Sequence, residues 1–154
     1  MTVYRCTLKK WSLDLTGQGA FLFGGRWNTP GHHALYTAEN NLLAALEVAI
    51  RIPLTKISSE YVMVPIDFPS IIEVYQPRLP KGWHSKIAIT QKIGDAFLED
   101  NKYLAMKISS ALMSNTFNFL LNPKHKFFTK VKAGKSESLL FDDRLVKMMT
   151  KENG

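Results

Sequence analysis

The sequence predicts an α+β protein with a mostly antiparallel or mixed sheet and flanking helices. Short runs of β-branched and aromatic residues recur along the whole chain, which is typical of strands. Only two segments carry the apolar spacing of longer helices, and they fall between strands of irregular length. This order disfavours a doubly wound parallel sheet, in which strands and helices alternate regularly.

The first part of the chain predicts two strands around a long loop. Residues 2–8 (TVYRCTL) alternate in polarity, as expected of an opening strand. Several glycines between residues 16 and 31 give the backbone freedom and indicate a loop. Residues 33–37 form a short run that predicts a second strand.

A helix is expected next, from about Asn40 to Arg51. The side chain of Thr37 or Asn40 can accept hydrogen bonds from the first N–H groups of this helix. The helix should stop by Ile52, because Pro53 disfavours helical geometry in the residue before it.

The rest of the chain predicts further strands and one more helix. Residues 61–67 (YVMVPID) and 71–75 (IIEVY) resemble strands, the first of them bent by Pro65. Residues 85–100 carry apolar side chains at mixed spacing, which predicts a helix. The remaining apolar runs predict short strands or strand-like elements at residues 103–109, 117–121, 127–131 and 139–141.

Length and composition fit one globular domain that spans residues 1–154, with its core at about 3–146. No apolar run is long enough to cross a membrane. The N-terminus MTVYRCTLKK lacks the apolar region of a secretory signal, so a cytoplasmic protein is expected. The single cysteine, Cys6, permits no internal disulfide and is expected to be a buried structural thiol.

The chain is basic, with a formal net charge of +7, and twelve of its lysines lie at or beyond Lys81. This charge fits an acidic or phosphate-bearing ligand, an acidic protein partner or nucleic acid. A solvated lysine surface is the simpler explanation. The lysines are scattered, and no basic motif interleaved with aromatic residues is present. A protein that binds nucleic acid or cleaves RNA is therefore kept as an alternative from another class.

Glu47 stands in the apolar run LLAALEVAI. From Leu42 to Ile52 only Glu47 and Arg51 are polar, which predicts a helix buried nearly all round. The simplest explanation of Glu47 is a surface ion pair with Arg51, four residues further on. The alternative is a carboxylate that faces a cleft between apolar walls and takes part in a reaction.

Arg26 and Tyr36 favour the second explanation. Arg26 follows two glycines that let the backbone approach a ligand closely, and its guanidinium suits a diphosphate or a carboxylate. Tyr36 offers a ring for stacking and a hydroxyl. Structural explanations exist as well, since Arg26 can bond to carbonyls or stack on Trp27, and Tyr36 can pack in the core. Together with Glu47, the two side chains can hold a dinucleotide between its phosphates and a reacting ribose.

These residues lie in motifs that resemble the RES domain, the toxin half of Xre–RES toxin–antitoxin modules. That family is named for an arginine, a glutamate and a serine. The set GGRWN–G–YT–E is specific, although no single piece of it is. The matching blocks follow the family's order and comprise YR at residues 4–5, GQGA at 17–20, GGRWNTPG, LYTA, the helix with Glu47, NFLLNPKH at 118–125 and FDDRL at 141–145.

The resemblance implies a fold like that of diphtheria-toxin-type ADP-ribosyltransferases, with a small split, mostly antiparallel sheet around an NAD cleft. It implies hydrolysis or phosphorolysis of the nicotinamide–ribose bond of NAD, and growth arrest by NAD depletion. Transfer of ADP-ribose to a protein target is the alternative. NAD is then a substrate, and neither a cofactor nor a metal is expected. The absence of a GxGxxG fingerprint agrees with this, because NAD would not be a Rossmann-bound hydride carrier.

Carried over by position, the resemblance implies that Arg26 binds NAD near its phosphates or ribose. It further implies that Tyr36 stacks in the cleft and that Glu47 is the catalytic carboxylate. Alignment on the asparagines of NFLLNP makes Ser110 the counterpart of the family's serine, with Ser109 in place of the family's proline.

Arg5 and Trp27 complete the expected NAD-binding set. Arg5 lies on the first predicted strand, where its family position suggests a side chain in the cleft, and a paired structural arginine is the alternative. The final block departs from the family at Asp143, where a proline is usual, and this is expected to be structural variation at a strand end.

A single carboxylate is enough for the implied chemistry. Ordinary glycosidases need two carboxyl groups, one of which protonates the leaving oxygen. Nicotinamide leaves NAD as a neutral molecule from a cationic nitrogen and needs no proton. One carboxylate can therefore stabilise the oxocarbenium-like ribose and hold its hydroxyl groups.

The histidines do not predict a metal site, because His32 and His33 are adjacent in a turn and no second cluster stands at ligand spacing. His125 is expected to be a turn residue with local hydrogen bonds. A scaffold that only binds an antitoxin is a further alternative, which the presence of the arginine, tyrosine and glutamate disfavours.

The resemblance also implies a partner, an Xre-family antitoxin whose chain end covers the NAD cleft and approaches Arg26. The toxin itself is expected to bind neither nucleic acid nor a membrane. A homodimer and a 2:2 or larger complex both stay open.

Overall fold

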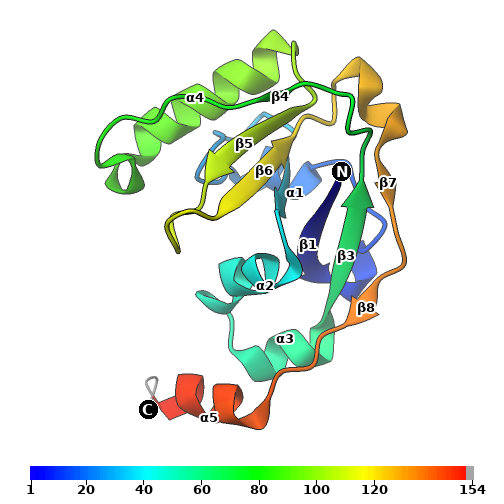
Figure 1. Ribbon diagram of the computed structural model, residues 1–154, viewed down its shortest axis with the longest axis vertical. Helices are drawn as coiled ribbons and strands as arrows, with labels where there is room; N and C mark the ends of the chain where they lie inside the picture. The colour runs from blue at the N-terminus through cyan, green and yellow to red at the C-terminus, as the bar shows by residue number, and fades with distance from the viewer. Residues whose placement is uncertain (152–154) are drawn as a thin grey trace.

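The computed structural model describes residues 1–151 and is built around one open sheet (Figure 1). The strands are β1 (Thr2–Leu8), β2 (Leu35–Ala38), β3 (Tyr61–Asp67), β4 (Val74–Tyr75), β5 (Ala105–Ser109), β6 (Phe117–Leu121), β7 (Lys132–Ala133) and β8 (Glu137–Ser138). They follow the order β4-β5-β6-β2-β1-β3-β7, and β8 also pairs with β3. Among these strands only β4 and β5 pair in parallel, so the predicted α+β class with a mostly antiparallel sheet is confirmed.

The helices flank this sheet. They are α1 (Gln18–Phe23), α2 (Asn41–Ala49), α3 (Leu54–Glu60), α4 (Ile87–Asp100) and α5 (Asp143–Lys151), with 3-10 turns η1 (Lys9–Trp11), η2 (Trp83–Ser85) and η3 (Lys126–Lys130). Figure 1 shows α4 along β5 and β6, while α2, α3 and α5 lie together at the other end of the molecule. None of the helices in residues 1–151 is long and apolar enough to cross a bilayer.

The sheet is split between β1 and β2. Strand β1 pairs with β3 along its whole length, from Thr2↔Asp67 to Leu8↔Tyr61. Strand β2 pairs with β6 along its whole length as well. Between β1 and β2, however, the single register pair is Tyr4↔Ala38, so the two strands diverge beyond it. The space between them becomes a cleft, and this split is the feature that the family resemblance implied.

Both faces of the sheet are covered, which explains why its central strands are nearly continuous apolar runs. In β6, Phe119 and Leu121 face one apolar cluster together with Val64 and Ile66 of β3. The alternating residue Leu120 faces the opposite cluster, beneath α4. The core is therefore two layers of side chains separated by the sheet.

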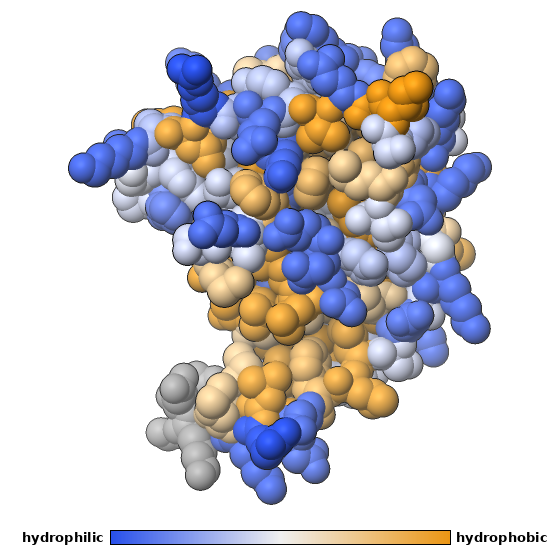
Figure 2. Space-filling view, viewed as in Figure 1, coloured by the Kyte–Doolittle hydropathy of each residue, from blue (hydrophilic) through white to orange (hydrophobic). Residues whose placement is uncertain are grey.

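The start of α2 agrees with the prediction, because the Asn40 side chain accepts a hydrogen bond from the Leu43 backbone N–H at 2.8 Å. The prediction that this helix is buried nearly all round is wrong. Leu43, Ala44, Ala45 and Ala49 are buried, while Leu42 and Ile50 are 64% and 60% exposed. Figure 2 shows apolar side chains gathered on the surface over α2, α3 and α5.

The segment at residues 16–31, predicted as a loop, contains the short helix α1. The glycines that suggested a loop bound this helix instead. Gly17 precedes it with φ of 71° and Gly24 follows it with φ of 68°, conformations that favour glycine. Helix α3 was not predicted either, because Pro53 indicated the end of α2. The same proline stands immediately before α3, where its missing N–H removes no intrahelical bond.

The two last predicted strands are also wrong. Residues 126–130 form η3, because the His125 ring accepts a hydrogen bond from the Phe127 N–H and starts a turn. Residues 139–141 form no strand, and Leu139 and Phe141 pack instead against the clusters under α2 and α3. Asp143 opens helix α5 and does not lie at a strand end.

We expect Asn40→Ala to lower the free energy of unfolding by about 1 kcal/mol, because α2 loses its N-terminal side-chain acceptor. Chemical denaturation measures this loss, and Asn40→Asp should retain most of the stability. Asn41→Ala, at the exposed neighbouring position, is the matched control. Equal losses for Asn40→Ala and Asn41→Ala would contradict the capping role.

Candidate active site

A cleft of about 760 Å³ opens where β1 and β2 diverge. Its walls come from both strands, from α1 and the glycine-rich turn after it, from α2, from the first turns of α4 and from the ends of β5 and β6. This volume lies within the range of small-molecule sites, about 300–1,000 Å³. The cleft-lining residues include five of the six expected from the sequence, namely Arg5, Arg26, Trp27, Tyr36 and Glu47.

Glu47 lies on α2 and its carboxylate is held from the facing strands. Its Oε1 accepts hydrogen bonds from Asn118 Nδ2 at 2.6 Å and from Ser110 Oγ at 3.1 Å. Arg51 donates to the backbone carbonyl of Glu47, and their side chains form no ion pair among residues 1–151. The surface ion pair that the spacing suggested is therefore wrong, and the carboxylate belongs to the cleft.

The two carboxylate oxygens of Glu47 differ in their surroundings. Both hydrogen bonds go to Oε1, while Oε2 accepts none from residues 1–151. One oxygen therefore fixes the orientation of the group, and the other can accept a hydrogen bond from a ligand.

Ser110, the sixth expected residue, does not line the cleft but donates a hydrogen bond to the Glu47 carboxylate. It follows the last residue of β5 and is only 3% exposed. Its backbone N–H donates to the Thr116 carbonyl at 2.9 Å, and its Oγ also accepts from the Leu112 N–H at 3.1 Å. The hydroxyl is thus fixed by the turn after β5 and donates its proton toward Glu47.

Arg26 lies in a tight turn in which the Gly25 N–H donates to the Asn28 carbonyl at 2.9 Å. Its Nη1 donates to the His84 carbonyl at 2.8 Å, and its guanidinium carbon lies 6.0 Å from the centre of the Trp83 ring. Stacking on Trp27 is therefore not the contact that forms. The His84 carbonyl is the only hydrogen-bond acceptor of the guanidinium within residues 1–151, so its other N–H groups can bind a ligand.

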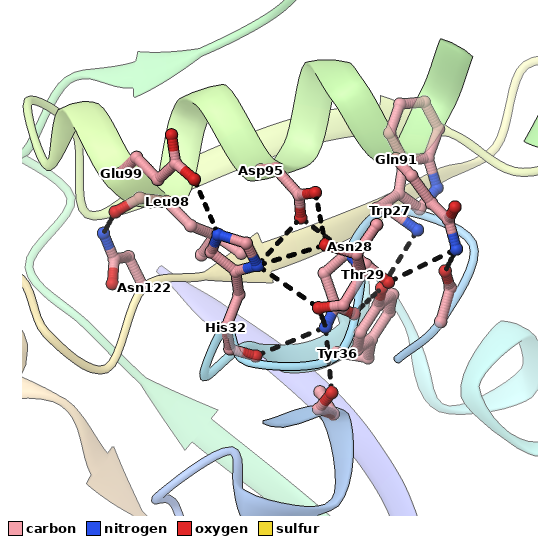
Figure 3. A network of polar contacts seen from close by, with 12 residues as sticks. Trp27, Asn28, Thr29, His32, Tyr36, Gln91, Asp95, Leu98, Glu99 and Asn122 are labelled. Carbon is pink, nitrogen blue, oxygen red and sulfur yellow. Dashed lines mark hydrogen bonds and ion pairs between the residues drawn. The ribbon is translucent and has the colours of Figure 1, made fainter. Parts of the chain in front are cut away.

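Tyr36 holds this turn through its hydroxyl, which donates to Asn28 Oδ1 at 2.7 Å and accepts from the Trp27 N–H at 3.0 Å (Figure 3). Gly25 must be glycine here, because a Cβ would lie 2.6 Å from that hydroxyl oxygen. Burial raises the pKa of the Tyr36 phenol, so the group stays neutral. Its hydroxyl is already committed, and the ring is what Tyr36 can offer a ligand.

Trp27 and Arg5 are tied into the protein more firmly than the sequence indicated. Trp27 is almost fully buried and packs against Trp83, with ring centres 5.6 Å apart. Arg5 donates through Nη1 to the carbonyls of Asp14 and Trp11, and burial lowers its pKa despite the nearby Asp14 carboxylate. Both residues line the cleft while holding its walls in place.

Comparison with known proteins identifies the family of this chain. The RES domain family model matches residues 2–142. The chain belongs to the RES domain family. It is 36% identical over 151 residues to Toxin Res of Yersinia enterocolitica, covering 94% of this chain and 99% of that protein. It is 31% identical over 155 residues to Toxin Res of Photorhabdus laumondii, covering 96% and 98%.

Two further similarities extend this picture of the RES chain. It is 29% identical over 141 residues to the Prs ADP-ribosylating toxin of Sphingobium sp. strain YBL2, covering 87% of this chain and 88% of that protein. Its fold is similar to a chain of the M. tuberculosis MbcT–MbcA toxin–antitoxin complex, with a TM-score of 0.73 and 20% identity over 97% of this chain and 88% of that one. The two chains therefore share a fold.

One residue of this RES cleft was missed as a site residue. Asn118 bonds directly to Glu47, and its own Oδ1 is buried without a partner in the described part of the chain. Buried unpaired polar atoms are rare and concentrate at functional sites. A signal was present, because Asn118 is the one polar residue within the apolar strand FNFLL.

No group of three or more metal-ligating side chains forms in the described part of the RES chain. His125 accepts the local hydrogen bond expected of it, from the Phe127 N–H, and its Nε2 also contacts the carbonyl of Lys102, 23 residues earlier in the chain. Cys6 is half-buried at the cleft, and burial raises the pKa of its thiol to about 11. The thiol therefore stays protonated at neutral pH.

We expect Tyr36→Phe to lower the free energy of unfolding by about 1–3 kcal/mol, because Asn28 Oδ1 and the Trp27 N–H both lose their partner. Chemical denaturation provides the measurement. Tyr75→Phe, at a partly exposed tyrosine outside the cleft, is the control and should change stability little. If the two variants were equally stable, the hydroxyl of Tyr36 would not hold the turn.

Proposed function

We propose that this RES-domain protein is the toxin of a toxin–antitoxin pair and that it cleaves the nicotinamide–ribose bond of NAD. The arrangement of Glu47 carries the proposal. Its carboxylate faces a cleft of suitable size, one oxygen is fixed by Ser110 and Asn118, and the other can bind a ligand. The toxin names of the relatives independently support the first part of the proposal, the role as a toxin.

The chemistry needs one anionic group beside the ribose. As the bond to nicotinamide breaks, the electron pair leaves with the ring, which departs as a neutral molecule. Positive charge then develops on the ribose, and a preorganised carboxylate stabilises it. In our proposal Oε2 of Glu47 accepts a hydrogen bond from a ribose hydroxyl. Ser110 and Asn118 keep the carboxylate oriented and take no part in the bond cleavage itself.

Arg26 and Tyr36 would bind the rest of the dinucleotide. The guanidinium of Arg26 keeps donors for the diphosphate, since it donates to only one carbonyl in the described chain. Tyr36 would present its ring to the substrate, because its hydroxyl holds the turn. Arg5 and Trp27 would shape the wall around the bound NAD. NAD acts here as substrate, and the proposal requires no further cofactor.

We expect Glu47→Gln to lower kcat for nicotinamide release by about 100-fold or more, because the neutral amide no longer stabilises the positive charge on the ribose. The assay follows nicotinamide released from NAD, and circular dichroism with thermal unfolding checks that the variant is folded. Glu60→Gln, at an exposed glutamate at the end of α3, is the matched control. Cleavage by Glu47→Gln at the wild-type rate would remove Glu47 from the mechanism.

The acceptor of the ADP-ribosyl group distinguishes the two forms of this reaction. Water would yield ADP-ribose, and inorganic phosphate would yield its phosphorylated form. Transfer to a protein is the alternative that the name of the Sphingobium relative favours. Separation of the products formed with and without phosphate, together with a labelled-NAD transfer assay in cell extract, assigns the acceptor.

The partner in this proposal is an Xre-family antitoxin that covers the NAD cleft. The similarity to a chain of a toxin–antitoxin complex supports a partner of this kind. The rim of the cleft supports this position for the antitoxin. Phe23, Ile50 and Ile87 line the rim and are 83%, 60% and 49% exposed. Apolar side chains at the mouth of a polar site favour burial by another protein.

We expect Phe23→Ser to weaken inhibition by the co-expressed antitoxin while leaving NAD cleavage by the free toxin close to wild type. The antitoxin would lose an apolar contact at the cleft mouth. Titration of NAD cleavage with purified antitoxin measures the effect. Ile71→Ser, at a more exposed residue outside this cleft, is the control, and equal inhibition of both variants would place the antitoxin elsewhere.

A further inference from the structure

We propose that helix α4 sets the position of Arg26, and that Thr90 and Gln91 are positioning residues for NAD binding. This inference rests on the proposed function, in which Arg26 binds NAD. The reason lies in the contacts between α4 and the turn at residues 25–28.

Residues of α4 contact all four backbone carbonyls of this turn. Gln91 Nε2 donates to the carbonyl of Gly25 at 2.9 Å and lies 3.4 Å from that of Asn28. Thr90 Oγ1 donates to the carbonyl of Arg26 at 2.6 Å. The carbonyl of Trp27 packs against Gly94, where a Cβ would lie only 1.7 Å from its oxygen.

The same face of α4 continues to hold the chain beyond the turn. Asp95 accepts from the Thr29 backbone N–H at 2.9 Å and from the Thr29 hydroxyl at 2.7 Å. Glu99 contacts His32 at 2.8 Å between Oε1 and Nε2. Figure 3 shows Gln91, Asp95 and Glu99 reaching from α4 toward this segment. Positions three to four residues apart lie on one helix face, so the segment at 25–32 is laid along a single face of α4.

The side chain of Arg26 is bound by the turn that leads into α4. Its Nη1 donates to the carbonyl of His84, in η2 directly before α4. Within the turn itself only the two bonds between Gly25 and Asn28 hold the backbone, and the second of them is long at 3.4 Å. The remaining support comes from the Tyr36 hydroxyl on one side and from α4 on the other, and it is α4 that binds the backbone carbonyl of Arg26 itself. Phe97 and Leu98 in turn anchor α4 in the core.

A substitution at Thr90 can distinguish a positioning role from direct contact with the substrate. The Thr90 side chain is fully buried and does not line the cleft, so it cannot touch NAD. Gln91 does line the cleft, and its removal would change both the turn and the cleft wall. Gly94→Ala would force the turn off the helix and can prevent folding. Thr90→Val keeps the shape of the side chain and removes only the hydroxyl, which makes it the decisive variant.

We expect Thr90→Val to raise KM for NAD about threefold to tenfold, which corresponds to the loss of one hydrogen bond, with kcat within about twofold of wild type. Binding through Arg26 acts on substrate and transition state alike, whereas a disturbed Glu47 would lower kcat. Thr90→Ser keeps the hydroxyl and should restore KM. Lys92→Ala, at an exposed position of α4, is the control. A wild-type KM in Thr90→Val, or no rescue by Thr90→Ser, would overturn the inference.

Hydrogen exchange tests the same inference without NAD. In Thr90→Val the backbone N–H groups of Gly25, Trp27 and Asn28 should exchange faster, while those of β5 and β6 keep their wild-type rates. Unchanged exchange in the turn would overturn the positioning role. Should the wild-type protein release no nicotinamide, the proposed function fails, and faster exchange in Thr90→Val still supports the control of the turn by α4.

Discussion

The divergence of β1 and β2 after the single pair Tyr4↔Ala38 is the constraint on which the rest of the structure depends. A fully paired sheet would close the space that the cleft occupies. Each strand instead satisfies its backbone groups on its other side, β1 with β3 and β2 with β6. The sheet therefore stays continuous and keeps a core on both faces while it opens a cavity lined by backbone and side chains of both strands.

Each candidate site residue in this cavity is held by an element that does not carry it. Glu47 lies on α2 but is oriented by Ser110 and Asn118 from the β5–β6 side of the split. Arg26 lies in a turn after α1 and contacts η2 and α4. These contacts join the two halves of the sheet through the site. They also fix the side chains before a ligand binds, so that the side chains lose little further freedom on binding.

Sequence reasoning located Arg26, Tyr36, Glu47 and Ser110 because their residue types and motif spacing are local features of the chain. It placed β1, β3, β6, α2 and α4 for the same reason, since periodicity and capping act over a few residues. It did not find α1 or α3, whose glycine and proline neighbours also mark loops and helix ends. Asn118 and the α4 contacts were not found, because each depends on strands and helices far apart in sequence.

What the sequence by itself determined is the family, the class of fold and the set of chemical groups: a guanidinium, an aromatic ring and a carboxylate within about twenty residues. Only the tertiary structure decided how these groups are used. It showed that Arg51 leaves the Glu47 carboxylate to Asn118 and Ser110, and that the Tyr36 hydroxyl is committed to the turn. The physical reason is that a hydrogen-bonding group takes the partner that packing brings within reach, and packing is set by strand pairing over the whole chain.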